Sequence, residues 1–194
     1  MGEKIKVIMD CDPGIDDGIA LAYAAAHQDE IELLAVTTFA GNQTIDKVTK
    51  NALELVDFYG LKVPVARGQE RPLVKEVIHA EEFHGETGLG HCVLPETGTK
   101  AASDNAVFFI REILDDLPEG QQVTFIETAP MTNLALLLRV FPEVKDKIRR
   151  IVFMGGAVKG GNVTPAAEFN IYADPEAAKI VFEAGIPLVM CGLD

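Results

Sequence analysis

The sequence predicts an α/β fold in which a mostly parallel, doubly wound, Rossmann-like sheet carries helices on both faces. Short apolar runs alternate with longer segments whose apolar residues recur at helical spacing. The apolar runs are almost uninterrupted, which is typical of parallel strands that are buried on both faces. The 194 residues contain no internal repeat, linker or low-complexity tract, so we expect residues 1–194 to form a single domain.

The first strands and the helix between them have the clearest patterns. Residues 6–9 form a short apolar run that ends before the turn-forming pair Pro13-Gly14, and residues 15–26 are mostly helix formers. Residues 31–38 are a second apolar run, rich in β-branched residues and leucine and closed by Ala40-Gly41-Asn42. These patterns predict a strand, a helix and a second strand, in that order.

A further helix and a short strand precede an irregular segment. Residues 44–59 have apolar side chains at helical spacing and end at Gly60, and residues 63–66 are expected to form a strand. Residues 68–103 show no clear period and hold three of the four histidines. A long irregular loop in a compact domain is usually functional or disordered.

Regular alternation resumes after residue 103. Asp104 is expected to cap the next helix, and Pro130 is expected to start the one after it. In chain order, we expect a helix at 104–117, a strand at 123–128, a helix at 130–138, a strand at 151–154, a helix at 175–184 and a strand at 187–191.

Composition limits the classes of partner. The formal net charge is −13, and the acidic residues are spread along the chain. Such a field repels phosphate backbones and anionic lipids, so we expect neither nucleic acid nor membrane as a partner, but a neutral small molecule or a cation. The three cysteines are far apart, and the N-terminal apolar run is too short for a signal peptide. Both observations favour a cytoplasmic protein with reduced thiols.

Four aspartates gather directly after the first predicted strand: Asp10, Asp12, Asp16 and Asp17. No Lys or Arg follows before Lys47, so these carboxylates have no nearby cation in the sequence. The dipole of the following helix favours the last two acids, and a helix-capping turn would explain one or two of the four. The remaining repulsion indicates a bound cation, and ligands that are all oxygen favour Ca²⁺ or Mg²⁺ over Zn²⁺.

The same residues carry a resemblance to a known family. The run at 10–17, Asp-Cys-Asp-Pro-Gly-Ile-Asp-Asp, resembles the N-terminal signature of the inosine–uridine nucleoside hydrolases. Further segments resemble that family in the same order, so that the resemblance covers essentially the whole chain: 37–44, 84–88, 128–133, 154–156 and 168–171.

The resemblance implies hydrolysis of the N-glycosidic bond of ribonucleosides to ribose and free base. It implies that Asp12, Asp17 and the backbone carbonyl of Thr128 bind Ca²⁺, which also holds the ribose diol and a water molecule. Asp12 is then the general base that deprotonates this water, and Asp16 hydrogen-bonds the ribose hydroxyls. General-base catalysis of this kind contributes roughly 10²–10⁴-fold in rate.

Other residues are implied to contact the nucleoside. His84 is expected to contact the base or leaving group, and Phe169 is expected to shield the sugar from water. The full set of expected substrate-binding residues is Asp16, Asn42, His84, Met154, Asn162, Glu168, Phe169 and Asn170.

The sequence also departs from the family pattern. Members of the family continue well beyond the position of Asp194, and their last part carries a His–Asp pair that supplies a leaving-group acid and a further calcium ligand. Without that part we expect weaker metal binding and weak or absent catalysis. The family further implies a homo-oligomer, a dimer or tetramer, and residues 162–168 lean towards pyrimidine-preferring members.

Two other functions fit part of the pattern. A haloacid-dehalogenase-like Mg²⁺ phosphatase also has an Asp-x-Asp after its first strand and a Thr at a later strand end, as in Asp10-Cys11-Asp12 and Thr128. Against it, Pro13-Gly14 follows the aspartates and no phosphate-binding Lys is evident. The other alternative is an inactive module that binds Ca²⁺ and ribose.

Overall fold

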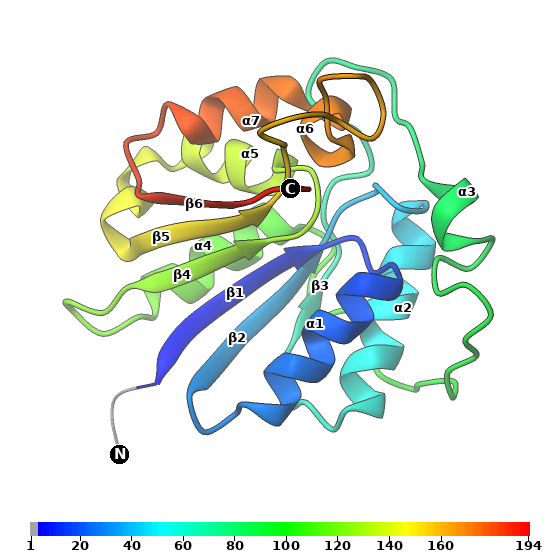
Figure 1. The fold of residues 1–194 in the computed structure, drawn as a ribbon. Coiled ribbons are helices and arrows are strands. Elements are labelled where there is room, and N and C mark those ends of the chain that lie inside the picture. The colour runs from blue at the N-terminus through cyan, green and yellow to red at the C-terminus, as the bar shows by residue number, and fades with distance from the viewer. Residues whose placement is uncertain (1–3) are drawn as a thin grey trace.

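One parallel sheet organises the chain (Figure 1). The computed structural model describes residues 4–194. Six strands pair in parallel in the order β3-β2-β1-β4-β5-β6, which confirms the predicted doubly wound fold. The strands are β1 (Ile5–Cys11), β2 (Ile31–Thr38), β3 (Val65–Ala66), β4 (Val123–Glu127), β5 (Ile148–Met154) and β6 (Leu188–Cys191).

Helices cover the sheet from both sides. Figure 1 shows α1 and α2 on one face and α4, α5 and α7 on the other. The described helices are α1 (Ile15–Ala26), α2 (Ile45–Phe58), α3 (Glu81–His84), α4 (Ala106–Asp115), α5 (Thr132–Val140), α6 (Phe169–Ala173), α7 (Pro175–Phe182) and the 3₁₀ helix η1 (Pro142–Lys147).

The two largest apolar clusters of the described residues lie on opposite sides of the sheet. The larger core packs Phe125 and Ile151 of the sheet against Ile110 of α4 and Leu134 of α5. The smaller core packs sheet residues such as Val36 against α1 and α2. Among residues 4–194, no helix combines the length and the apolar character that crossing a membrane requires.

Several predicted boundaries were wrong. The cap of α4 is Asn105 rather than Asp104, because the Asn105 side chain accepts a hydrogen bond from the amide of Phe108 at 3.2 Å. β5 starts at Ile148, three residues earlier than expected, because its first residues pair with β4. The short helices α3 and α6 were not predicted, since four or five residues are too few to show helical periodicity.

The chain direction places the candidate site. The strand order reverses between β1 and β4, and ligands of such sheets bind beyond the carboxyl ends of the strands at this point. β1 is longer than predicted, so Asp10 is its penultimate residue and pairs in register with Glu127 of β4. The acidic cluster therefore begins inside the sheet and continues into the loop beyond it.

Candidate active site

A cavity of about 230 Å³ lies beyond the carboxyl ends of the strands. It brings together segments that are distant in the sequence, from the N-terminus of α1 to the N-terminus of α6. Its walls contain all eight residues predicted to bind substrate, together with Thr128 and three residues that were not predicted. The lining residues are Asp16, Asn42, Ala80, Phe83, His84, Thr128, Met154, Asn162, Val163, Glu168, Phe169 and Asn170.

Asp12 does not line the cavity but is hydrogen-bonded to Asn42, which does. The backbone amide of Asn42 donates to Oδ2 of Asp12 at 2.7 Å, and its side-chain amide donates to Oδ1 at 3.2 Å. Asp12 is only 1% exposed, and burial, followed by the nearby charge of Asp17, raises the pKa of its carboxyl well above the usual range. A side chain at the neighbouring Gly41 would collide with this carboxylate, so the close approach of the loop after β2 requires glycine there.

Asp17 is the second buried carboxylate of the cluster. It lies in the first turn of α1, where its Oδ2 accepts from the amide of Gly14 at 3.1 Å. Its Oδ1 accepts from the hydroxyl of Thr128 at 2.6 Å, which joins α1 to the end of β4. Burial, followed by the charge of Asp16, raises the pKa of Asp17 to about 7.

Asn170 connects the far wall of the cavity to the strand ends. Its side-chain amide donates to the backbone carbonyls of Thr128 at 2.9 Å and Met154 at 3.0 Å. Glu168 caps the same short helix: it accepts from the amides of Asn170 and Ile171 and from that of Gly156. Both side chains are buried, and their hydrogen bonds hold the short helix α6 against the ends of the strands.

The opposite wall comes from α3. Nδ1 of His84 accepts from the backbone amide of Ile15 at 3.3 Å and lies 3.9 Å from Oδ1 of Asp16. Phe83, its neighbour, is 77% exposed and lines the cavity, as do Ala80 and Val163. Their apolar surface could have been anticipated only for Phe83, because it adjoins a histidine that was already singled out.

A second layer of buried acids lies beneath the cluster. Asp10 accepts from the hydroxyl of Thr37 at 2.5 Å and from the side-chain amide of Asn133 at 2.9 Å, and burial raises its pKa to about 6. Glu127 is also fully buried, and burial, followed by the charge of Asp10, raises its pKa well above the usual range. Sequence reasoning missed Glu127, although an acidic residue in an otherwise apolar strand can indicate a functional site.

The arrangement fits a hard cation. Within the described part of the chain, neither Asp12 nor Asp17 forms an ion pair with a Lys, Arg or His. Among residues 4–194, no three His, Cys, Asp or Glu side chains are arranged to hold a metal ion. The predicted ligand set contains only two such side chains, Asp12 and Asp17, because its third member is the backbone carbonyl of Thr128. A calcium ion at this position would need further ligands. Oxygen donors of this kind suit Ca²⁺.

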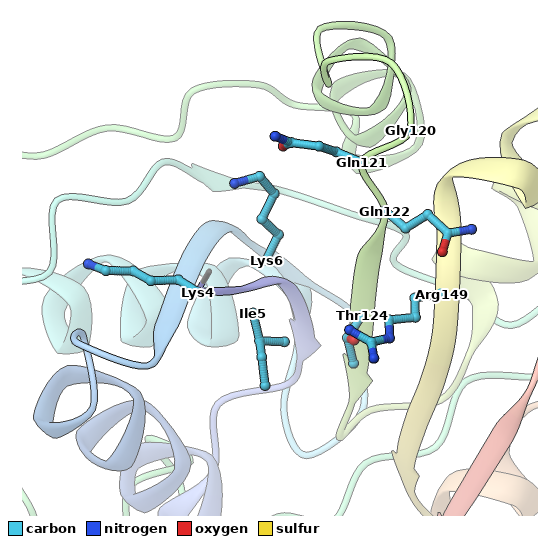
Figure 2. A pocket seen from close by; sticks show the side chains of 8 residues that line it. All are labelled: Lys4, Ile5, Lys6, Gly120, Gln121, Gln122, Thr124 and Arg149. Carbon is cyan, nitrogen blue, oxygen red and sulfur yellow. The ribbon is translucent and has the colours of Figure 1, made fainter. Parts of the chain in front are cut away.

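A second cavity, of about 240 Å³, lies at the opposite end of the sheet, among the amino ends of the strands (Figure 2). Its charged residues are Lys4, Lys6 and Arg149, whose side chains point apart rather than towards one centre. Lys6 is already paired with Glu32 at 2.5 Å. We assign the candidate site to the carboxyl end, because the buried groups there include carboxylates from several elements, whereas the buried polar atoms that line the amino-end cavity, Gln121 Oε1 and Thr124 Oγ1, are uncharged.

Known proteins match nearly the whole chain. Residues 7–194 match the model of the inosine-uridine preferring nucleoside hydrolase family. Two proteins named pyrimidine-specific ribonucleoside hydrolase RihA are 50% identical over 191 residues (Salmonella typhimurium) and 51% identical over 189 residues (Photobacterium profundum). The matches cover 98% and 97% of this chain and 60% of each relative.

Solved structures agree with this assignment. A purine-preferring ribonucleoside hydrolase from Gardnerella vaginalis superimposes with a TM-score of 0.90 at 36% identity, over 97% of this chain and 60% of that one. A plant nucleoside hydrolase gives a TM-score of 0.91 at 36% identity, over 98% of this chain and 60% of that one. The chain thus spans about 60% of the length of these relatives. Sequence and fold together show that it belongs to the inosine-uridine preferring nucleoside hydrolase family.

Proposed function

We propose that the protein hydrolyses the N-glycosidic bond of ribonucleosides to give ribose and the free base. The observation that carries the proposal is the carboxyl-end cavity, where a pair of buried, cation-free carboxylates adjoins a wall of amide and carboxylate groups. These groups suit a ribose, which requires acceptors for its hydroxyls and negative charge beside the cation that develops on it. The family membership of the chain supports the same reaction.

Each polar residue then has a task. Asp12 accepts the proton of the attacking water, whose oxygen bonds to the anomeric carbon while the bond to the base nitrogen breaks. The leaving base takes up a proton as it departs. Asp16, Asn42, Glu168 and Asn170 accept from or donate to the ribose hydroxyls, and the acids also stabilise the positive charge that builds up on the sugar. His84 and Phe169 contact the base and exclude water.

Members of this family depend on a metal ion, and we propose that the ion is calcium. Asp12, Asp17 and the carbonyl of Thr128 would hold it; the bond from the Thr128 hydroxyl to Asp17 and the burial of both carboxylates support this choice. When bound, calcium supplies positive charge that makes a neighbouring water more acidic and attracts the ribose diol. Asp17 is kept in place for this role by the Thr128 hydroxyl and the Gly14 amide.

Pyrimidine nucleosides are the substrates that we propose. The RihA relatives at about 50% identity are named pyrimidine-specific, whereas the purine-preferring structure is 36% identical. The apolar surface of Phe83, Val163 and Phe169 suits a flat base. We further propose that the protein acts in the cytoplasm as a homo-oligomer.

The test is ribose release from uridine, cytidine and inosine in calcium, in chelator, and with Asp12→Asn. We expect release in calcium that ends on chelation and in the variant, with uridine or cytidine preferred. Activity that survives chelation would contradict the metal-assisted reaction. Release of phosphate from an aryl phosphate would favour the phosphatase alternative, and calorimetric ribose binding without turnover would favour the inactive binding module.

A further inference from the structure

A buried carboxylate outside the predicted site lies between α6 and α7. Asp174 is fully buried and accepts three hydrogen bonds: from the hydroxyl of Thr132 at 2.6 Å, the amide of Leu73 at 2.9 Å and the amide of Ala177 at 3.0 Å. The bond to Ala177 caps α7, as an Asp at this position ordinarily does. The other two reach α5 and a loop 101 residues away in the sequence, which capping does not require.

A second contact joins the same loop to the same helix. The Lys75 amino group donates to the backbone carbonyl of Tyr172 at 2.5 Å, and it lies 3.3 Å from the centre of the Tyr172 ring. A cation above an aromatic ring is stabilised by the ring's quadrupole. Lys75 and Asp174 therefore attach the loop to both ends of the Tyr172–Asp174 turn.

These contacts connect the two walls of the candidate active site. The loop consists of residues 73–80. At its start Leu73 is bonded to Asp174, and at its end Ala80 precedes α3, which carries His84. On the way, Nδ1 of His79 lies 3.1 Å from the carbonyl of Gly41, so the far end of the loop is fixed as well. The other wall is α6 with Glu168 at its cap and Asn170 in its first turn. Residues 73–80 thus span from one wall to the other.

We infer that Asp174 and Lys75 are positioning residues: by holding residues 73–80 against α6, they fix the two walls at the spacing that binds the sugar. The inference deepens the proposed function and rests on it for its effect on substrate. A helix of five residues has little stability of its own, so α6 depends on such outside contacts. A displacement of about 1 Å in a binding wall can cost up to ~10²-fold in rate.

The first experiment measures amide hydrogen exchange and requires no ligand. Lys75→Met removes the cation from a partly exposed side chain, and Lys179→Met on α7 is a control with the same change of charge away from the cavity. We expect Lys75→Met to speed exchange about tenfold in both residues 73–80 and residues 169–173, with no change in the control. Asp174→Asn, which keeps a capping oxygen but loses one acceptor, should do the same. Exchange in α6 that stays unchanged in both variants would overturn the inference.

The second experiment measures binding of ribose and uridine in calcium by calorimetry. We expect the Kd to rise about tenfold in Lys75→Met, to stay within about twofold in Lys75→Arg, and to be unchanged in Lys179→Met. An unchanged Kd in Lys75→Met would overturn the positioning role. If the unaltered protein bound and cleaved nothing, the proposed function would fail, while the exchange data would still decide whether the two walls are coupled.

Discussion

The two ends of the sheet have cavities of nearly equal volume, about 230 Å³ at the carboxyl end and 240 Å³ at the amino end. At the carboxyl end, the buried carboxylates of Asp12 and Asp17 form no ion pair with any Lys, Arg or His among residues 4–194, and they accept hydrogen bonds from several elements. At the amino end, the cations are exposed or already paired, as Lys6 is with Glu32. Volume therefore does not distinguish the two cavities, but the cost of burying their charges does.

The two ends differ in the free energy that burial of their charged groups requires. Burial of unpaired carboxylates opposes folding unless a proton or a cation neutralises them. No such cost arises at the other end, because water solvates the exposed Lys4 and Arg149 and Glu32 pairs with Lys6. A cation that binds beside these carboxylates offsets the unfavourable burial of their charge. We therefore expect calcium to bind at the carboxyl end and not at the amino end.

The largest difference between the two ends should appear in activity. Asp12→Asn removes the proposed base and one calcium ligand, so we expect ribose release from uridine to fall by ~10³-fold or more. Arg149→Gln alters the charge of the amino-end cavity and should leave the rate within about twofold. The comparison breaks if Asp12→Asn retains a tenth of the activity, or if the arginine variant loses as much.

The next effect is on stability in calcium-free buffer. The pKa of Asp17 is raised to about 7 and that of Asp10 to about 6, both above the ordinary value near 4. Folding therefore favours the protonated carboxyls, and this contribution is complete below pH ~4 and is lost as the pH rises through 6 and 7. We expect the free energy of unfolding to fall by ~2 kcal/mol or more between pH 5 and pH 8.

Two controls isolate that effect. Asp17→Asn cannot titrate, so its stability should fall less over the same range, and added calcium at pH 8 should restore stability in the unaltered protein. Chemical denaturation at several pH values gives the measurement. If the pH dependence were identical in the protein and the variant, Asp17 would not contribute to it.

We expect a smaller difference between the two ends in the effect of substitutions on calcium affinity. Asp17→Asn should weaken calcium binding at least ~10-fold, the least that loss of a supporting group costs in known metal sites. Lys6→Gln at the amino end should leave the calcium Kd unchanged. Titration calorimetry of the two variants provides the comparison, and equal affinities would place calcium somewhere other than the aspartate cluster.

The smallest predicted effect concerns the wall of the cavity. Glu168→Gln keeps the size of the side chain but removes its charge, so we expect the KM for uridine to rise about tenfold, with a smaller change in kcat. Because Glu168 also caps α6, unfolding should become easier by ~1 kcal/mol. A fall in kcat at constant KM would mean that this side chain acts in the reaction rather than in binding.

The sequence sufficed for those features that depend on neighbouring residues. The aspartates at 10–17 are close together in the chain, so the sequence alone predicted their clustering and suggested a cation among them. The strand–helix alternation was equally local, and it predicted the sheet. The resemblance to a family then supplied the distant residues that line the cavity.

Features that depend on strand register or on very short elements were not foreseen. The contact of Asp10 with Asn133 joins residues 123 positions apart, and the pairing of Asp10 with Glu127 requires the register of β1 and β4. Helix α6 is capped by the Glu168 side chain, whereas α3 begins after Ala80 without a side-chain cap, and both helices are too short for a periodicity to reveal them. The link from Leu73 to Asp174 was invisible for the same reason.

A crystal structure of the protein grown with calcium and ribose tests the central claim most directly. We expect one calcium ion at ~2.3–2.6 Å from carboxylate oxygens of Asp12 and Asp17 and from the Thr128 carbonyl, with the sugar hydroxyls in the adjoining cavity. Density that shows ribose elsewhere, and both aspartates in their present hydrogen bonds with no ion between them, would contradict the account.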